Sequence, residues 1–569
     1  MSQNRTYQKI GLKVHFRFDY DAGIVEAIKE ISWKERVYVA ISKEWVVNLT
    51  SATQPAIVEI IEKFSFIKST EPIAESSDNN VEDYIKKRSR LKFVKSFTDL
   101  ISTMPSGIKP YKFQEEDIDY MCSWGKMING NDMGLGKSVE TIFSTEITNR
   151  FPCLLICPSS TKYQWKELWH KVNKDRSISI LDSKSDCDWG SDVVIINYDM
   201  LGNKEFFTNK DGEEDWRAVP KFPELLSVKW RYIVLDEIHW VKHSKSLRSK
   251  TLKLITKGVE NIHGLTGTLV ENRPSELMNP LNLIGVFQDI FGGWGNFTTR
   301  YCDAKETRYG KDISGSSNEL ELHRLLRETC YIRKEKRDVL QDLPDIQTSV
   351  LDIDIDNLKM YCKAEDSFIE YMEENFSKMK VDSALMAQFL VQRDKLRQLS
   401  VVGKIKGIKE WLEDFIEQST EKVLIVGNYT EPLQKLSEYL SCEIIDGSKD
   451  AFQKRELIKN WSTNKKQFML GNIRAVGTGT DGLQDSCSTL VIIDLPDKPS
   501  TLDQLISRLE RIGQKNAINV YFLLSQLTID MHLWEVIEAK RQIMEAINKG
   551  KKVEQIDINT LLIKSYLKR

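Results

Sequence analysis

Short apolar runs of three to five residues recur along most of the chain, each bounded by polar or turn-forming residues. One series comprises Leu154–Cys157, Val193–Ile196, Tyr232–Leu235 and Ile262–Leu265, and a second comprises Val423–Val426, Phe468–Leu470, Leu490–Ile493 and Val520–Leu524. Runs of this kind are typical of strands buried on both faces of a parallel sheet. Helical stretches separate them, so the pattern predicts two α/β lobes with a cleft between them.

The segments outside the two lobes predict an N-terminal domain, a linker, an insertion and a C-terminal tail. The first 67 residues mix strand-like and helix-like patterns, which indicates a small α+β domain, and a polar stretch follows. Within that linker a basic run is either a solvated helix face or a patch that contacts phosphates or directs nuclear import; it comprises Lys86, Lys87, Arg88, Arg90, Lys92 and Lys95. The predicted boundaries are 1–67 (N-terminal domain), 68–100 (linker), 101–300 (first lobe), 301–400 (mainly helical insertion), 401–545 (second lobe) and 546–569 (C-terminal tail).

Bulk composition excludes several classes of protein. Because 81 Lys and Arg are offset by 83 Asp and Glu, any contact with nucleic acid must come from local patches. No apolar run approaches the roughly 20 residues that cross a bilayer, and the polar first residues do not resemble a secretory signal. The nine cysteines form no CxxC pair, which favours core positions in a reducing compartment. We therefore expect an intracellular protein without a membrane partner, cytoplasmic if bacterial or viral and nuclear if eukaryotic.

Residues 132–138 carry the first candidate chemistry. Phosphate-binding loops need unhindered backbone N–H groups in front of a helix N-terminus, followed by a lysine and a hydroxyl. The predicted nucleotide-binding residues are Asp132, Met133, Gly134, Leu135, Gly136, Lys137 and Ser138. Lys137 would reach the β- and γ-phosphates of ATP, and the Ser138 hydroxyl would join the shell of a Mg²⁺ ion. Asn131 departs from the template, which asks for glycine there.

An acidic pair follows the apolar strand that begins at Tyr232. Asp236 is predicted to hold Mg²⁺, and Glu237 to orient or deprotonate the attacking water. His239 is a candidate for coupling hydrolysis to movement. Gln114, which lies upstream of the loop, is a candidate for reading the adenine edge. Together these residues predict hydrolysis of a nucleoside triphosphate.

With these residues placed, the chain resembles the Swi/Snf family of superfamily-two helicases, which are ATP-driven translocases on duplex DNA. The resemblance covers roughly Pro105 to Lys540. The matching segments, in the family's order, are Asp132–Ser138, Cys157–Trp165, Asn197–Tyr198, Asp236–His239, Leu265–Thr268 running on to Leu277, Lys422–Asn428, Ile445–Gly447 with Arg455, Gly477–Leu483 and Gln504–Gln514. This likeness implies two RecA-like parallel-sheet lobes with helical insertions.

The resemblance also implies roles for individual residues. Arg508 and Arg511 would complete the ATP site from the opposite lobe, where a guanidinium stabilises charge on the transferring phosphoryl group. The candidates for contact with DNA phosphates in the first lobe are Ser159, Ser160, Thr161 and Lys162. The candidates for coupling the ATP and DNA sites are His239, Thr266, Thr268, Gly479, Asp481 and Gln504.

The sequence differs from the family pattern at two places and resembles one branch of the family more than the others. Leu495–Asp497 stands where the family usually has a tryptophan, and Gly477–Leu483 has an uncommon spacing. Within the family, Tyr301–Lys305 and Tyr331–Lys336 resemble the annealing-helicase branch related to HepA-like (HARP) proteins. Residues 16–66 resemble the HARP module of that branch; the alternative is an adaptor of unrelated descent.

The sequence thus predicts an ATP-dependent translocase that rewinds, remodels or branch-migrates DNA. The expected partners are duplex or branched DNA, bound through phosphates, and a single-strand-binding or repair protein, with the chain itself a monomer. One alternative is a strand-separating helicase or the motor subunit of a restriction or defence complex. Another is a DNA-structure-binding scaffold with an inactive ATPase.

Overall fold

The chain folds as two compact units, Met1–Lys87 and Arg88–Arg569, in the computed structural model. The structure describes residues 5–10, 13–18, 21–31, 36–39, 44–48, 53–68, 108–182, 187–208, 213–307, 310–340, 343–376, 383–477, 480, 482–511 and 513–549. The basic run at 86–95, Gly479, Asp481 and most of the expected tail lie outside these residues. None of the helices within the described ranges is long and apolar enough to span a bilayer.

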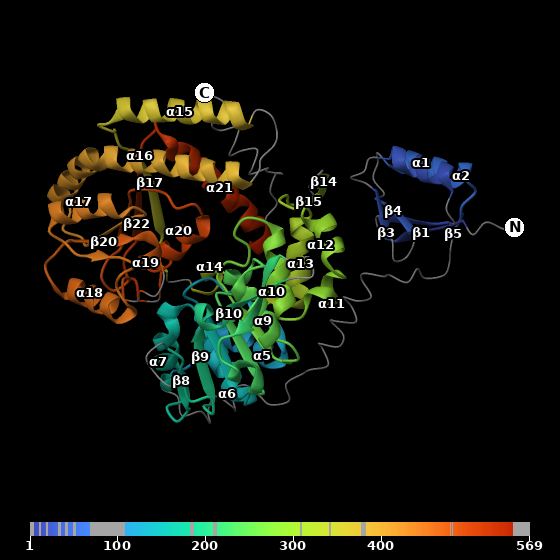
Figure 1. Ribbon diagram of the computed structural model, residues 1–569, viewed down its shortest axis with the longest axis horizontal. Coiled ribbons are helices and arrows are strands. Elements are labelled where there is room, and N and C mark those ends of the chain that lie inside the picture. The colour runs from blue at the N-terminus through green and yellow to red at the C-terminus, as the bar shows by residue number, and fades with distance from the viewer. Residues whose placement is uncertain are drawn as a thin grey trace. The chain divides into compact units, whose positions relative to one another are not determined.

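The N-terminal unit is a five-stranded sheet with two helices packed on one face (Figure 1). Its elements are β1 (Thr6–Ile10), β2 (Lys13–Arg17), α1 (Ala22–Glu30), β3 (Arg36–Val39), β4 (Glu44–Asn48), α2 (Gln54–Lys63) and β5 (Ile67–Lys68), in the sheet order β3-β4-β2-β1-β5. Val14 and Phe16 alternate along β2, and Ile24 and Ile28 share one side of α1, so both sets face one core. Asp21 caps α1 by accepting from the N–H of Gly23. This α+β arrangement agrees with the predicted fold class.

The first lobe is built on a seven-stranded parallel sheet in the order β16-β6-β13-β12-β7-β9-β8. The strands are β6 (Lys126–Asn129), β7 (Cys153–Cys157), β8 (Ile178–Ile180), β9 (Val193–Asn197), β12 (Tyr232–Asp236), β13 (Ile262–Leu265) and β16 (Tyr331–Ile332). Helices and loops fill the connections (Figure 1, teal to green). Every residue of β7 and β9 is buried, which explains why these strands read as continuous apolar runs.

The other elements of this lobe are listed by residue. The helices are α5 (Lys112–Ser123), α6 (Lys137–Thr148), α7 (Lys162–Val172), α8 (Glu224–Ser227), α9 (Leu247–Ile255), α10 (Met278–Leu283), α11 (Phe287–Phe291), α12 (Trp294–Tyr301), α13 (Glu319–Thr329) and α14 (Lys336–Val339). Short 3-10 turns are η1 (Ser159–Thr161), η2 (Tyr198–Met200), η3 (Ile238–Val241) and η4 (Pro274–Leu277). Two antiparallel ribbons pair β10 (Gly202–Thr208) with β11 (Glu214–Pro220), and β14 (Lys305–Thr307) with β15 (Gly310–Asp312).

The second lobe is a six-stranded parallel sheet in the order β17-β22-β21-β18-β20-β19. Its strands are β17 (Ile346–Asp352), β18 (Val423–Gly427), β19 (Ile444–Ile445), β20 (Phe468–Asn472), β21 (Thr489–Ile492) and β22 (Ile518–Leu524). Its helices are α15 (Leu358–Phe376), α16 (Ser383–Gln418), α17 (Thr430–Leu440), α18 (Ala451–Thr463), α19 (Ile473–Gly477), α20 (Pro499–Ile506) and α21 (Ile529–Lys549). The two parallel-sheet lobes predicted from the apolar runs are confirmed.

The segment between the lobes differs from the expected helical insertion over residues 301–400. Tyr331 and Ile332 form the edge strand of the first sheet, and Ile346–Asp352 forms the edge strand of the second. A two-residue strand carries no readable periodicity, which is why the sequence pattern gives no sign of it. The Tyr331 ring lies so close to Gly130 that a Cβ there would sit 2.0 Å from it, so the loop that leaves β6 needs glycine at this point.

Candidate nucleotide site and lobe interface

The phosphate-binding loop has the backbone shape that its glycines were expected to give. Gly134 and Gly136 have φ angles of 89° and 85°, in the left-handed region that favours glycine. The helix α6 begins at Lys137, directly after this turn, so its N-terminal N–H groups open toward the loop. The predicted residues 132–138 therefore present a helix N-terminus suited to an anion.

The Lys137 ammonium lies against its own loop. Its Nζ donates to the carbonyl of Asn131 at 2.6 Å and to that of Asp132 at 3.3 Å. Burial lowers the pKa of Lys137, and the negative charge of Glu237 is the largest influence in the opposite direction. A polyphosphate would supply the negative charge that this buried ammonium meets only in part.

Gln114 is buried and supports the loop. Its amide nitrogen donates to the Leu135 carbonyl at 2.8 Å, and its carbonyl oxygen accepts from the Tyr111 N–H at 2.9 Å. A Cβ on Gly136 would lie 2.4 Å from that amide nitrogen, so the close approach depends on glycine. The structure thus gives Gln114 a loop-supporting contact, and its reading of adenine stays a prediction.

Asp132 is held from a distant part of the sequence. Its carboxylate forms an ion pair with Arg333 and accepts from the Lys336 N–H at 3.1 Å. Arg333 also donates to the carbonyls of Gly130 and Gly267. Arg333 thus ties the start of the loop to the segment that follows β13, a role that no local signal in the sequence indicates.

A buried polar network lies beneath the loop and explains Asn131. The Asn131 amide donates to Asp117 at 2.8 Å and to Glu140 at 3.2 Å, and Asn129 donates to Glu140 at 2.6 Å. Lys334 pairs with Asp117 at 3.1 Å. Burial, together with the charge of the neighbouring Asp117, raises the pKa of Glu140 to about 8. A glycine at position 131 would leave these acids without their shared donor.

Asp236 is fixed by two aromatic residues. The Trp165 indole donates to its Oδ2 at 2.9 Å, and the Tyr198 hydroxyl donates to its backbone carbonyl at 2.7 Å. Burial, together with the charge of Glu237, raises the pKa of Asp236 to about 7. A bound cation would stabilise the ionised form. Trp165 is 3% exposed, so it positions this carboxylate instead of stacking on a base.

Glu237 and His239 form a pair beside Asp236. Glu237 adopts a left-handed backbone conformation, with φ of 52°, and its Oε2 lies 3.2 Å from His239 Nδ1. Burial opposes ionisation of both groups, but their mutual hydrogen bond and opposite charges outweigh it, so the pKa of Glu237 is lowered and that of His239 is raised. The Glu237 carboxylate is therefore ionised and able to accept a proton from water.

His239 connects this pair to Thr266. The Thr266 hydroxyl donates to the Thr268 carbonyl at 2.8 Å, and its oxygen lies 3.0 Å from His239 Nδ1. Thr266 is fully buried and Thr268 is 3% exposed. The three predicted coupling residues His239, Thr266 and Thr268 thus form one continuous chain of contacts.

The second lobe meets the first at the loop and at Glu271. Lys336 donates to the Glu510 carbonyl at 2.6 Å, and Arg511 Cγ lies 3.7 Å from where a Cβ of Gly134 would sit. Glu271 accepts from Lys498 at 2.8 Å and from Ser500 at 2.9 Å. These contacts join the first lobe to α20, the helix that precedes the second lobe's arginines.

The two arginines differ in position. Arg511 lies against the phosphate-binding loop, as just described. Arg508 donates to the Gly477 carbonyl at 2.7 Å and to the Thr480 carbonyl at 3.2 Å, within its own lobe. Its charge still lowers the pKa of Glu237, so Arg508 lies near the site as well.

The residues predicted to contact DNA differ in how exposed they are. Ser159 is exposed, whereas Ser160 and Thr161 are half-buried, and all three form the η1 turn. Gln504 lies in α20. Lys162 is 7% exposed and donates to the Leu181 carbonyl at 3.1 Å, so its contact with phosphates stays a prediction that this burial does not support. Its helical position next to the exposed turn gave no sign of this burial.

At Leu495–Asp497, where the sequence departs from the family pattern, Asp497 forms ion pairs with two arginines. Asp497 accepts from Arg393 at 2.7 Å and from Arg397 at 3.1 Å, both in α16. The positive charges of Arg397 and Arg393 outweigh burial and lower the pKa of Asp497. An ionised aspartate here therefore anchors α16 to the loop that leads into the last motif.

The oxygen donors suit Mg²⁺ but do not form a complete site. Ser138 and Asp236 offer a hydroxyl and a carboxylate, which are ligands that this ion prefers. Among the described residues, no group of three or more His, Cys, Asp and Glu side chains could hold a metal ion. Further ligands would have to come from nucleotide phosphates and water, as is usual for Mg²⁺ at phosphoryl-transfer sites.

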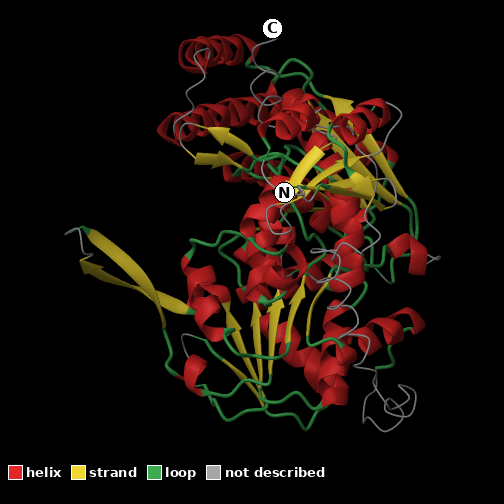
Figure 2. Ribbon diagram, turned by 90° about the vertical axis from the view of Figure 1, so that its right-hand side faces the viewer, coloured by secondary structure: helices red, strands yellow, loops and turns green. Residues whose placement is uncertain are grey.

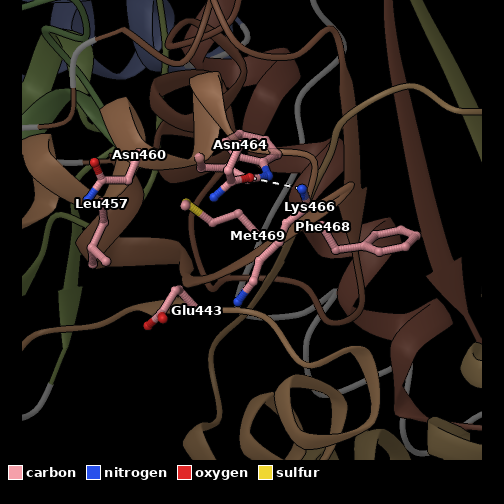
Figure 3. Close-up of a pocket in the computed structure, with 8 residues that line it drawn as sticks. Glu443, Leu457, Asn460, Asn464, Lys466, Phe468 and Met469 are labelled. Atoms are coloured by element: carbon pink, nitrogen blue, oxygen red, sulfur yellow. Dashed lines mark hydrogen bonds between the residues drawn. The ribbon is translucent and has the colours of Figure 1, made fainter.

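A small pocket of the second lobe lies apart from these groups. It encloses about 110 Å³ and is lined by Glu443, Leu457, Asn460, Trp461, Asn464, Lys466, Phe468 and Met469 (Figure 3). In the turn that forms part of its wall, the backbone N–H of Lys466 donates to the side-chain oxygen of Asn464 at 2.9 Å. No predicted site residue lines this pocket.

Two parallel-sheet lobes, a phosphate-binding loop in one and arginines from the other at their interface define the class of two-lobed, RecA-like nucleotide-binding motors. Residues 43–401, more than half of the chain, match the SNF2-related domain, and residues 404–513 match the helicase conserved C-terminal domain. The chain belongs to the SNF2-related family, which confirms the resemblance.

Named relatives extend this result. The chain is 26% identical over 456 residues to the SWI/SNF-related matrix-associated actin-dependent regulator of chromatin subfamily A-like protein 1 of Xenopus tropicalis, covering 78% of this chain and 45% of the relative. It is 26% identical to the mouse DNA annealing helicase and endonuclease ZRANB3. That match covers 75% of this chain and 40% of the relative. The chain thus spans less than half the length of these relatives. Such matches confirm the likeness to the annealing-helicase branch.

A solved structure, the Sulfolobus solfataricus SWI2/SNF2 ATPase core in complex with double-stranded DNA, also matches. It is 19% identical and covers 78% of this chain and 95% of its own, with a TM-score of 0.35. The two-lobe assignment rests on the sheets of this chain itself and on its family membership.

Proposed function

We propose that this chain hydrolyses ATP to move along duplex DNA and rewinds or branch-migrates it. The observation that carries the proposal is the approach of Arg511 to the phosphate-binding loop from the second lobe, close to Gly134. An arginine supplied across a lobe interface makes hydrolysis depend on lobe closure, and such residues contribute roughly 10³–10⁵ in rate. The names of the relatives support the DNA-annealing direction.

Each residue of the site would have a separate role in ATP hydrolysis. Lys137 and the N-terminus of α6 would bind and orient the phosphates, while Ser138 and Asp236 would hold Mg²⁺, which neutralises phosphate charge when bound. Glu237 would take a proton from the attacking water at its carboxylate, held there by His239. The chain of contacts from His239 to Thr268 would carry the state of this carboxylate toward the second lobe.

Contacts with DNA would be made mainly to phosphates. The η1 turn, which begins with the exposed Ser159, stands at the carboxyl edge of the first sheet, where ligands of parallel α/β sheets bind. Phosphate contacts carry no sequence information, so we expect binding to be independent of sequence and to weaken steeply with salt. A motor that acts on DNA works in the compartment that contains DNA, which agrees with the intracellular location expected from the sequence.

The deciding experiment measures ATP turnover with no DNA, single strands, linear duplex and forked duplex, at two salt concentrations. Stimulation by duplex or fork, lost in Glu237→Gln, supports the translocase. Stimulation by single strands alone would instead favour a strand-separating helicase. The absence of turnover under every condition, with DNA binding retained, would favour a scaffold with an inactive ATPase.

A further inference from the structure

An antiparallel ribbon of the first lobe has a surface that the nucleotide site does not use. The strands β10 and β11 pair over seven residues each, from Gly202 opposite Pro220 to Thr208 opposite Glu214. In Figure 2 this long ribbon projects away from the sheet of its lobe. Two large aromatic side chains on it face solvent, Phe206 with 60% and Phe207 with 43% of their surface exposed.

The base of the ribbon is firmly attached. A Cβ on Gly202 would lie 2.4 Å from the Thr251 hydroxyl, so the ribbon packs closely on α9 at this point. The preceding turn is tied to the nucleotide site because the Tyr198 hydroxyl donates to the Asp236 carbonyl. At about 3.4 Å per residue, Phe206 stands about 14 Å beyond Gly202. The exposed Phe206 therefore stands well away from the packed base of the ribbon.

The ribbon leaves the sheet at the same edge as the nucleotide site and the η1 turn. The strands β12, β7 and β9 are neighbours and parallel, so their carboxyl ends lie at one edge. At that edge β12 ends in Asp236, β7 leads into the η1 turn, and β9 leads into the ribbon. From the nucleotide site outward, the ribbon thus lies one strand beyond the turn that we expect to contact DNA phosphates.

The two faces of the ribbon differ in charge. Residues directly opposite each other in an antiparallel pair share a face, so Phe206 and Trp216 lie on the same side. On that side the ammonium groups of Lys204 and Lys250 lie 4.7 and 3.7 Å from the centre of the Trp216 ring. Glu214 is the one acid among the described ribbon residues on this face, and it stands at the far end.

Among the ribbon residues that the structure describes, the opposite face carries no comparable set of cations. There Arg217 donates to Glu205 in a bidentate pair at 2.9 and 3.0 Å, which neutralises both groups. Phe207 shares this face with Asp215, its direct partner across the ribbon. Aromatic rings flanked by lysines are the combination that binds unpaired bases, because the rings stack and the ammonium groups meet phosphates. This combination is present on the Phe206 face and missing from the Phe207 face.

We propose that the Phe206 and Trp216 face of the β10–β11 ribbon binds unpaired bases of DNA at a branch point. The proposal rests on the DNA motor function proposed above and gives it a preferred substrate. A duplex passing the η1 turn would offer stacked, paired bases that the aromatic face cannot reach. A fork or junction offers unpaired bases, and the ribbon holds an exposed ring ready for them.

The test uses the full chain and two DNAs without ATP: a forked duplex with 2-aminopurine as the first unpaired base, and a linear duplex with the same base paired. Stacking on Phe206 is expected to quench the fluorescence of the 2-aminopurine on the fork. Phe206→Ala should weaken this quenching and raise the Kd for fork relative to duplex by roughly 5-fold or more, since one stacked base contributes at least that much. Phe206→Trp should restore both readouts.

Phe207→Ala is the matched control because it removes the same side chain from the opposite face. It should keep the wild-type ratio of the two Kd values. Equal effects of the two alanine variants, or no effect of Phe206→Ala, would overturn the proposal and point to a protein partner for the exposed rings. Because these readouts need no hydrolysis, a wild-type protein without DNA-stimulated turnover would disprove the motor function and leave this test intact.

Discussion

The carboxylate of Glu271 in the first lobe lies 2.8 Å from the ammonium of Lys498 in the second. The same carboxylate lies 2.5 Å from Lys242 of its own lobe. Burial would raise the pKa of Glu271, but the positive charges of His239, Lys242 and Lys498 outweigh it and lower the pKa to about 2. An ionised Glu271 therefore links the histidine of the nucleotide site to the second lobe.

Replacing Glu271 by Gln should uncouple the lobes. The neutral amide loses the charge that holds Lys498, while the phosphate-binding loop is untouched. We expect DNA-stimulated ATP turnover to fall roughly 5-fold or more, at the lower end of coupling energies of about 1–3 kcal/mol, with nucleotide affinity retained. Glu321→Gln is the control, since that carboxylate pairs with Arg300 within the first lobe. Parallel losses in nucleotide affinity and turnover would contradict a coupling role.

Glu237→Gln and Lys137→Ala test the two halves of the hydrolytic site. Glutamine keeps the size of Glu237 but cannot accept a proton, so turnover should fall by roughly 10²–10⁴, the usual contribution of a general base. Lys137→Ala removes the ammonium that we propose binds the phosphates and should weaken nucleotide binding as well. Both variants should still bind duplex DNA in a fluorescence anisotropy assay. Turnover at the wild-type rate in either variant would disprove the assignment of the site.

The sequence predicts most of the fold because the strands of both lobes are buried on two faces. Leu154–Cys157 and Val423–Val426 are continuous apolar runs, and both lie within strands of the structure. The loop at Asp132–Ser138 is equally local, because its glycines and lysine act within seven positions of each other. Local chemistry of this kind is readable without a structure.

Long-range partners are not readable in the same way. Arg333 reaches Asp132 across 201 positions, through a strand of two residues that has no periodicity. Trp165 looked like a residue of an amphipathic helix, and its hydrogen bond to Asp236 depends on how α7 packs against β12. The β10–β11 ribbon is not buried in a core: every residue of β10 after Gly202 is exposed, and no residue of β11 is fully buried. It therefore lacks the apolar runs that reveal the central strands.

The acids beneath the loop should make stability depend on pH. Burial raises the pKa of Glu140 from 4.5 to about 8, so the folded state holds a proton that the unfolded state releases. The corresponding stability is present below pH 4.5 and is lost as pH rises through about 8. Glu140→Gln carries no such proton, so its urea midpoint, measured relative to wild type, should rise between pH 6 and pH 8.5. A constant difference between the two proteins would contradict an ionisable Glu140.

A buried ion pair in the second lobe gives the last prediction. Lys404 is fully buried and donates to Asp530 at 2.6 Å, and also to the carbonyls of Ile493 and Leu523. Lys404→Met leaves the Asp530 carboxylate without its cation and should destabilise the lobe by about 3–5 kcal/mol. Asp530→Asn should be destabilising too, because it strands the ammonium.

The double variant Lys404→Met/Asp530→Asn distinguishes pairing from packing. It leaves no unpaired charge, so its cost should be smaller than the sum of the two single costs. Urea unfolding followed by tryptophan fluorescence measures all three variants against wild type, with circular dichroism to establish that each is folded beforehand. Costs that simply add would mean that the pair contributes no coupling, and that α16 and α21 are joined by apolar packing alone.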